Sequence, residues 1–324
     1  MFGIKSHNHT FVILGGNSNP ELLKEIATRL NSHPADVIVD KFPEGEIHVQ
    51  IKENVRGKDV FIVQSTCTPT NDNLMELLIL IDAAKRASAS RITAVLPFYG
   101  YARQDRKDRP RVPITAKLVA NLLTKAGADR ILAMDLHAGQ IQGFFDIPVD
   151  HLYSINVIGE YILKKNLKNL VVVSPDVGGI RMARAYAKVL NCNLAIVDKR
   201  RENATQTHVM HIIGSVEKQN VVLVDDMIST GGSLVEAVSA LKEAGALDIY
   251  AAIVHPILTG PAITRIEKSN LKELIVSNSI PMLPEKKIAK ISQLSVATLL
   301  AEAIQRIHRN ESVSSLFDKL GVEA

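Results

Sequence analysis

The chain has 324 residues, a length that favours two domains because single domains commonly hold about 100–200 residues. Hydrophobic residues make up 46% of the chain, enough for two cores, whereas aromatic residues make up 4% and the net charge is +4. The scarcity of aromatic side chains argues against a base-stacking nucleic-acid surface, and the small charge favours a small anionic ligand over a polymer.

Other features favour a cytoplasmic location without a membrane partner. No stretch reaches the roughly 18 apolar residues that a membrane span needs, and residues 1–10 lack the apolar core of a signal peptide. The two cysteines, Cys67 and Cys192, lie far apart and lack the spacing of metal ligands. We therefore expect two reduced thiols in a soluble protein.

Short apolar runs alternate with helical patterns along the chain. Several runs are β-branched and apolar on both faces, which is typical of parallel strands covered by helices on both sides. The runs that predict strands are residues 60–64, 92–97, 131–136, 170–174, 194–197, 221–224, 249–254 and 274–276.

Helix boundaries are marked by capping residues. A polar residue followed by proline opens a helix, and glycine ends one. The expected helices begin at Pro20 after Ser18-Asn19, span 73–87 with Asp72 as N-cap, span 114–125 between Pro113 and Gly127, span 234–244 before Gly245, and span 296–307.

This alternation predicts an α/β fold with mostly parallel sheets flanked by helices and right-handed crossovers. The order repeats loosely in the two halves, although too few residues match to establish a repeat from the letters alone. We place the domain boundary near Asp150, which gives domains of residues 1–150 and 151–324.

The first candidate site is the turn Phe42-Pro43-Glu44-Gly45-Glu46. Its ring is suited to stacking on a purine, and its carboxylates can accept hydrogen bonds from amino or hydroxyl groups. Taken alone, the segment is also typical of a surface turn.

A basic loop, Tyr99 to Arg109, follows the apolar run 92–97. A loop after a strand's carboxyl end faces the usual ligand crevice of an open α/β sheet, and arginine forks match phosphate oxygens. The interleaved acids argue against a nucleic-acid patch.

Two further strand ends carry candidate magnesium ligands, His137 and Asp176. Mg²⁺ prefers oxygen ligands and keeps several waters, so the aspartate is the better candidate. The triplet Lys199-Arg200-Arg201 follows another strand and precedes a polar stretch, residues 202–208. A basic loop that closes over a transferring phosphoryl group neutralises its charge.

The clearest phosphate signal lies in residues 221–233. Four apolar residues lead into Asp225-Asp226, and the loop Ser229-Thr230-Gly231-Gly232-Ser233 leads into a helix. The N–H groups of a glycine loop at a helix N-terminus bind a phosphate, and glycine permits close approach and positive φ. The acid pair suits ribose hydroxyls. A Walker-type loop is absent, so an ATP site must be built differently.

In this order the segments resemble the ribose-phosphate pyrophosphokinases, over nearly the whole chain. The most specific matches are residues 71–78, 99–107, 135–150 and 224–233. The resemblance implies two type I phosphoribosyltransferase-like domains, which transfer the pyrophosphoryl group of ATP to the C1 hydroxyl of ribose 5-phosphate and release AMP. It also implies Mg²⁺ as cofactor and, as in the phosphate-activated class, a homo-hexamer whose active site is shared between subunits.

The resemblance further assigns roles to individual residues. ATP-binding residues would be Phe42, Glu44, Gly45, Glu46, Arg103, Gln104 and Asp108, with the turn 42–46 supplied by a neighbouring subunit. Ribose 5-phosphate would be bound by Asp225, Asp226, Ser229, Thr230, Gly231, Gly232 and Ser233. His137 and Asp176 would lie near the metal, and Lys199 and Arg201 would stabilise the transition state.

The chain departs from the family where Glu44 and Ser229 replace the usual aspartates, and where the stretch after Arg201 lacks prolines. Two alternatives remain at this point. A phosphoribosyltransferase would use the same loop, but would leave the arginine-rich first half without a role. A non-catalytic, synthetase-associated subunit would keep the fold, although the catalytic candidates are all present.

Overall fold

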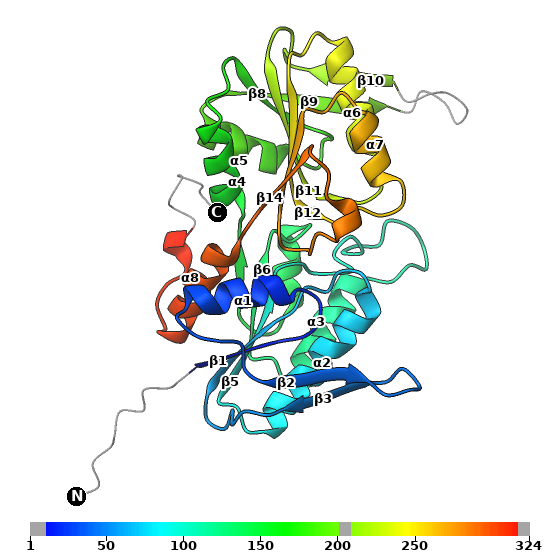
Figure 1. Ribbon diagram of the computed structural model, residues 1–324. Coiled ribbons are helices and arrows are strands. Elements are labelled where there is room, and N and C mark those ends of the chain that lie inside the picture. Colours follow the sequence, from blue (N-terminus) through cyan, green and yellow to red (C-terminus); the bar gives the residue numbers. More distant parts are fainter. Residues whose placement is uncertain (1–10, 201–208, 317–324) are drawn as a thin grey trace, which may run out of the picture. The chain divides into compact units, whose positions relative to one another are not determined.

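The computed structural model describes residues 11–200 and 209–316. They form two compact units, which we describe separately (Figure 1). Unit 1 contains the residues up to Leu152 together with Leu300–Val313, and unit 2 contains Tyr153–Leu299 and the short segment that follows Val313. Both units are α/β, as predicted. Within the described residues, no helix has the length and apolarity needed to cross a membrane.

Unit 1 is built on a five-stranded, fully parallel sheet in the order β1-β4-β5-β6-β7. Its strands are β1 (Phe11–Gly15), β4 (Asp59–Val63), β5 (Arg91–Leu96), β6 (Arg130–Met134) and β7 (Val149–Leu152). A separate antiparallel hairpin contains β2 (Val37–Lys41) and β3 (Ile47–Ile51). The helices are α1 (Pro20–Arg29), α2 (Thr70–Arg86), α3 (Thr115–Ala126) and the 3-10 helix η1 (Gly139–Phe144).

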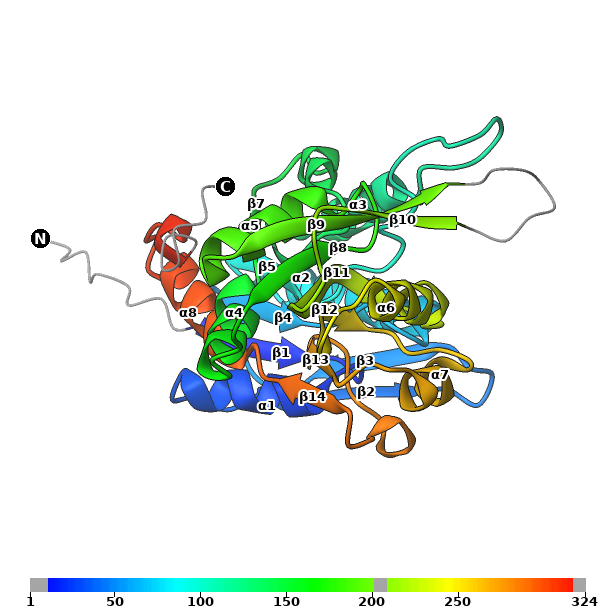
Figure 2. The ribbon, with the colours of Figure 1, turned by 90° about the horizontal axis from the view of Figure 1, so that it is seen from above.

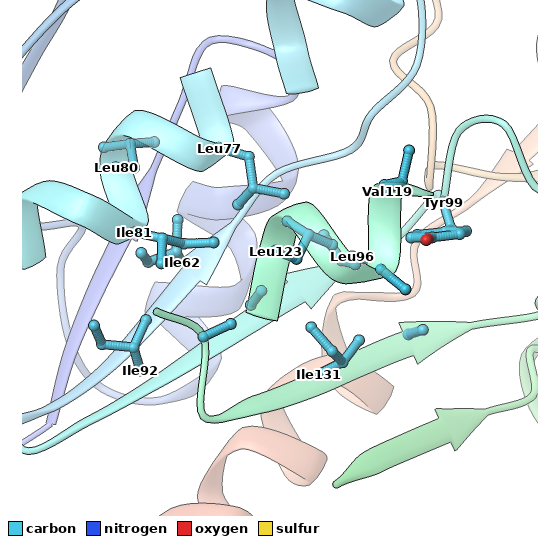
Figure 3. Packing of buried hydrophobic residues seen from close by; sticks show 14 of the residues in the cluster. Ile62, Leu77, Leu80, Ile81, Ile92, Leu96, Tyr99, Val119, Leu123 and Ile131 are labelled. Atoms are coloured by element: carbon cyan, nitrogen blue, oxygen red, sulfur yellow. The ribbon is translucent and has the colours of Figure 1, made fainter. Parts of the chain in front are cut away.

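The core of unit 1 lies on both faces of its sheet. On one face, α2 and α3 cover the strands, and Leu77, Leu123 and Ile62 are fully buried there (Figure 3). On the other face, the Phe11 ring contacts both Phe61 and His308 of the last helix. Burial on both faces explains why these strands read as continuous apolar runs.

Unit 2 has a seven-stranded sheet in the order β10-β9-β8-β11-β12-β13-β14, in which only the edge strand β10 is antiparallel. The strands are β8 (Leu170–Ser174), β9 (Asn193–Arg200), β10 (Val209–Ile213), β11 (Asn220–Ile228), β12 (Ile249–Pro256), β13 (Glu273–Ser277) and β14 (Ile291–Leu294). The helices are α4 (Ile155–Lys164), α5 (Ile180–Leu190), α6 (Gly232–Glu243) and α7 (Ala262–Lys268), with 3-10 helices η2 (Pro284–Lys286) and η3 (Ser314–Leu316).

Helices again cover both faces of this sheet. Side chains of α6 and α7 pack with Val171, Leu223 and Ile253 in one core, and α4 and α5 pack against β8, β11 and β13. Figure 2 shows α4 and α5 on one side of the strands of unit 2 and α6 and α7 on the other.

The two units repeat one order of elements, strand, helix, hairpin, strand, helix, strand, helix, strand, 3-10 helix, strand. The series runs from β1 to β7 in unit 1 and from β8 to β14 in unit 2. The loose repeat expected from the sequence therefore exists at the level of element order. In unit 1 the hairpin forms its own sheet, whereas in unit 2 it extends the main sheet.

All eight strands predicted from apolar runs are present, and most helix caps are confirmed. Asn19 accepts a hydrogen bond from the Leu22 N–H at 3.2 Å, and Gly127 and Gly245 end their helices with positive φ. Asp72 as N-cap was wrong, because α2 begins two residues earlier at Thr70. The Asp72 carboxylate instead pairs with Lys41 of β2 at 2.6 Å.

The boundary expected at Asp150 falls inside β7, and unit 1 extends to Leu152. The C-terminal segment was expected in the second domain, but part of it belongs to unit 1. The last helix, α8 (Ala297–His308), joins unit 1 from Leu300 onward. Three side chains explain this. The Asp59 carboxylate accepts hydrogen bonds from Arg91, with Nε at 2.9 Å, and lies 2.9 Å from His308 Nδ1. Arg91 also donates to the Ile307 carbonyl at 2.9 Å.

We predict that Arg91→Ala lowers the free energy of unfolding by about 3 kcal/mol, because it leaves the buried Asp59 carboxylate without its cation. Arg86→Ala, which breaks the exposed pair with Asp82 on α2, is the matched control and should change stability little. Urea unfolding followed by circular dichroism measures both. Equal effects of the two substitutions would contradict the role given to Arg91.

Candidate active-site residues

The predicted phosphate loop joins β11 to α6 in unit 2. The strand continues to Ile228, residues 229–231 form the turn, and Gly231 is the N-cap with φ of 72°. Glycine is required here because other residues rarely adopt this left-handed conformation. Since the N-cap has no side chain, it leaves the N–H groups of the first turn available to an anion.

Asp225 and Asp226 lie half-buried near the end of β11. The Asp226 N–H donates to Asp225 Oδ1 at 2.9 Å. Burial, followed by the neighbouring Asp226 and Asp176 carboxylates, raises the pKa of Asp225 to about 8. Asp176 follows β8, which pairs with β11, so the parallel register brings three predicted site carboxylates into electrostatic contact.

Sequence reasoning missed two residues that contact the loop, Thr259 and Arg265. The Thr259 N–H donates to the Ser229 carbonyl at 3.0 Å, and the two hydroxyls lie 3.0 Å apart. Arg265 Nη1 donates to the Thr230 carbonyl at 3.0 Å. The available signal was that Thr259 follows the carboxyl end of the strand 249–254, where ligand loops of parallel sheets converge.

Of the two catalytic candidates, Lys199 lies on β9, which pairs with β10. Lys199 is opposite Met210 in the antiparallel register of this pair. The pairing with β10 therefore fixes the backbone of Lys199 near the end of β9. Arg201 lies outside the described residues.

The turn 42–46 connects β2 to β3 in unit 1. The Gly45 N–H donates to the Phe42 carbonyl at 2.8 Å, and Gly45 has a φ of 96°. Glu44 and Glu46 are exposed, and the Phe42 side chain is 46% exposed with its ring centroid 5.1 Å from that of His48. The turn thus presents an aromatic face and two carboxylates to its surroundings.

The basic loop follows β5 and packs closely where it begins. A Cβ on Gly100 would lie 2.4 Å from the Thr66 carbonyl oxygen, so only glycine fits there. Burial raises the pKa of the Tyr99 hydroxyl, which donates to the Ala116 carbonyl at 2.8 Å. Beyond this anchor, Arg103, Gln104 and Asp108 are exposed. The Gln104 amide oxygen accepts a hydrogen bond from the Thr115 hydroxyl.

The first turn of α2 connects these two segments. Asp72 pairs with Lys41 just before the turn 42–46, and Asn71 accepts a hydrogen bond from the Tyr101 hydroxyl of the basic loop. Gln140 of η1 donates to Asp105 at 3.0 Å. The structure therefore links the separate candidate segments of unit 1 through side-chain contacts.

His137 is exposed after β6, in the same unit. The segment before it turns sharply at Asp135, which has a φ of 41°. The buried His151 of β7 accepts a hydrogen bond from the Leu136 N–H at Nε2, at 2.9 Å. His151 therefore holds the strand end that carries His137, a role for which the sequence offered no signal.

The predicted metal residues fall in different units, His137 in unit 1 and Asp176 in unit 2. In the part of the chain that is described, no three or more His, Cys, Asp or Glu side chains form a ready-made metal site. Magnesium does not require one, because it commonly uses one or two carboxylates with substrate phosphates and water. The carboxylates of Asp176, Asp225 and Asp226 fit that preference.

Known proteins of one family match this chain over nearly its whole length. Residues 11–127 match the model of the N-terminal domain of ribose phosphate pyrophosphokinase, and residues 201–318 match that of the phosphoribosyl synthetase-associated domain. A ribose-phosphate pyrophosphokinase from Chlorobaculum tepidum is 58% identical over 96% of this chain and 96% of its own length. One from Helicobacter pylori is 54% identical over 97% and 98%, respectively.

Among solved structures, a phosphoribosylpyrophosphate synthetase from Mycobacterium smegmatis matches with a TM-score of 0.89 and 43% identity. The match covers 93% of this chain and 99% of that one. With identity above 50% across almost the full length of both relatives, and with the fold in agreement, the chain belongs to the ribose-phosphate pyrophosphokinase family.

Proposed function

We propose that this protein transfers the β,γ-pyrophosphoryl group of ATP to the C1 hydroxyl of ribose 5-phosphate, giving phosphoribosyl pyrophosphate and AMP for nucleotide biosynthesis. Family membership supports the reaction. The observation that carries it is the open loop of unit 2, with the carboxylates of Asp225 and Asp226 on one side and the first turn of α6 on the other.

Unit 2 is the ribose 5-phosphate side of this proposal. The N–H groups of Gly232 and Ser233, with the hydroxyls of Thr230 and Ser233, bind the 5-phosphate at the start of α6. Asp225 and Asp226 repel phosphate and accept hydrogen bonds from the ribose hydroxyls instead. This polarity orients the sugar with its phosphate on the loop and its C1 hydroxyl away from it.

Unit 1 is the ATP side. Arg103, Gln104 and Asp108 are exposed and have groups available for the nucleotide, and arginine suits phosphate oxygens. The Phe42 ring stacks on the adenine, and Glu44, Gly45 and Glu46 contact its polar edge. Exposure of the turn 42–46 supports its donation to the active site of a neighbouring subunit.

Mg²⁺ belongs to the same proposal, with His137 of unit 1 and Asp176 of unit 2 as the candidate residues. When bound, the ion neutralises charge on the triphosphate. Asp176 keeps one oxygen on the Gly179 N–H at 2.9 Å, which fixes the direction of its carboxylate. A cation held there would relieve the repulsion among these acids, which adds to burial in raising the pKa of Asp225.

The transfer requires positioning and charge neutralisation more than a protein nucleophile. The C1 oxygen forms a bond to the β-phosphorus of ATP and loses its proton, while the bond between that phosphorus and the α,β-bridging oxygen breaks to release AMP. Lys199 and Arg201 neutralise the oxygens of the transferring group, since fixed cations act most strongly in a site closed from water.

Self-association is also part of the proposal, as a hexamer with shared active sites. Met75 of α2 and Leu118 and Leu122 of α3 are exposed on neighbouring helices, and their exposed fractions are 47%, 54% and 39%. A second copy of the chain would cover such exposed apolar side chains. The two free cysteines, of which Cys67 is buried, support a cytoplasmic location.

The decisive assay incubates purified protein with ATP, Mg²⁺ and ribose 5-phosphate, and measures AMP. We expect AMP and phosphoribosyl pyrophosphate in equal amounts, and none without ribose 5-phosphate. The absence of AMP with folded protein would contradict the proposed activity. Consumption of phosphoribosyl pyrophosphate with a nucleobase would favour a phosphoribosyltransferase.

We predict that Lys199→Ala lowers kcat by about 100-fold or more with little change in the KM for ribose 5-phosphate, because the cation acts on the transition state. Steady-state kinetics on AMP release measures both constants. Lys218→Ala, an exposed lysine of unit 2 beside Glu217, is the control. A variant at position 199 that keeps near-normal kcat would contradict the role.

We predict that Asp225→Asn stabilises the protein more at pH 8 than at pH 5 while weakening ribose 5-phosphate binding. The folded-state pKa of about 8 exceeds the usual value of 3.8, so the wild type holds a proton that the unfolded chain has released. Its stability therefore falls as pH rises from about 4 to 8. Melting temperatures at both pH values test this, with exposed Glu243→Gln as control. A pH-independent effect would contradict the prediction.

A further inference from the structure

We propose that Arg265 of α7 binds the 5-phosphate of ribose 5-phosphate, as the guanidinium partner of the loop 229–233. The inference rests on the proposed function, because it adds a residue to the same sugar-phosphate site. Arg265 lies outside the loop in sequence, and none of the motifs that predicted the site includes it.

The position of α7 behind the loop is the first support. Arg265 Nη1 donates to the Thr230 carbonyl at 3.0 Å. The Cβ of any residue placed at Gly231 would lie 3.6 Å from the Ala262 backbone, so α7 packs directly against the turn. Thr259, just before α7, bonds both the backbone and the hydroxyl of Ser229. The whole turn is therefore braced by the segment that carries Arg265.

The contact with Gly232 locates the guanidinium more closely. A Cβ at Gly232 would lie 3.2 Å from Arg265 Nη1 and 3.9 Å from its Cζ. Gly232 is the first residue of α6, whose free N–H groups form the expected phosphate cradle. The cation thus lies beside the same residue that would present its N–H to the phosphate. Glycine at position 232 leaves the space that the guanidinium occupies.

The remaining hydrogen-bond capacity of Arg265 points to a ligand. The side chain is exposed, and among the described residues its guanidinium donates only to the Thr230 carbonyl. Since a guanidinium has five N–H donors in a planar fork, most of them are available for phosphate oxygens. One donor holds the side chain on the loop, and the others remain available to a ligand.

The negative charge near the loop explains why a cationic residue would be needed there. The Asp225–Asp226 pair lies near the end of β11, just before the loop, and the negative charge of the pair repels an incoming phosphate. The helix N-terminus supplies only a partial positive charge. A full charge on Arg265 offsets the repulsion on the side of the loop where the phosphate binds.

The test measures ribose 5-phosphate and ribose binding by calorimetry, without ATP, in wild type, Arg265→Ala, Arg265→Lys and Lys268→Ala. Lys268 is an exposed cation on the same helix and serves as the matched control. We expect Arg265→Ala to weaken ribose 5-phosphate binding by about 10- to 100-fold, Arg265→Lys to restore part of it, and Lys268→Ala to stay within about twofold. Ribose binding should not change in any variant.

Salt dependence separates phosphate contact from bracing of the loop. Loss of a direct cation–phosphate contact flattens the dependence of affinity on salt concentration, so Arg265→Ala should show a smaller slope than wild type. Equal losses in the alanine and lysine variants with a wild-type slope would show that Arg265 only holds Thr230, and would overturn the proposal. Unchanged affinity in Arg265→Ala would overturn it as well.

The AMP assay keeps this inference distinct from the proposed function. If wild type binds ribose 5-phosphate through Arg265 but forms no AMP, the proposed function fails and the phosphate contact stands. If wild type forms AMP and Arg265→Ala keeps the same KM for ribose 5-phosphate, the contact fails and the function stands. Wild-type protein that neither binds ribose 5-phosphate nor forms AMP overturns both.

Discussion

The parallel pairing of β11 with β8 on one side and β12 on the other is the constraint on which the unit 2 site depends. Parallel strands end at the same edge of a sheet, so the residues that follow them must meet there. Asp176 after β8, the turn after β11 and Thr259 after β12 come from distant parts of the sequence. After β12, the N–H groups of Leu258 and Thr259 donate to the carbonyls of Ile228 and Ser229 and continue the strand pairing. These bonds hold the turn without any ligand.

The repeated order of elements shows why only one unit keeps this turn open. In unit 1 the equivalent turn follows β4, and its groups bond to the protein itself. The Ser65 N–H donates to the Ser18 hydroxyl at 2.8 Å, and the Thr66 hydroxyl accepts from the Gly100 N–H at 2.6 Å. The Gln64 and Glu76 side chains hydrogen-bond to each other at 2.9 Å and are buried. A phosphate would have to displace these bonds, so the exposed hairpin turn and basic loop are the better candidates for ligand contacts in unit 1.

The sequence predicted what is local or buried on both sides. Eight strands were recognised because both of their faces are apolar. β2 and β3 were missed because their side chains are only partly buried and form no continuous run. β1, β7, β10 and β14 were missed as well, although β1 is an apolar, largely buried strand. The loop from Asp225 to Ser233 was recognised because all its parts are contiguous. Arg265 is 35 residues from Thr230, and His151 is 15 residues from Leu136. Their contacts depend on strand register, which the letters do not reveal. The docking of Leu300–Val313 on unit 1 likewise depends on Asp59 and Arg91, far away in the chain.

Ser229 illustrates how a departure from a family pattern acquires a physical meaning. Its hydroxyl lies 3.0 Å from that of Thr259, so this position holds the turn against the neighbouring segment through a neutral hydrogen bond. The family's usual aspartate would add a charge close to Asp225, whose pKa is already raised to about 8 by burial and by two other carboxylates. Serine keeps the bracing contact without adding to that repulsion. In this chain Ser229 therefore anchors the turn with a neutral side chain, while the acidic groups beside the turn are Asp225 and Asp226.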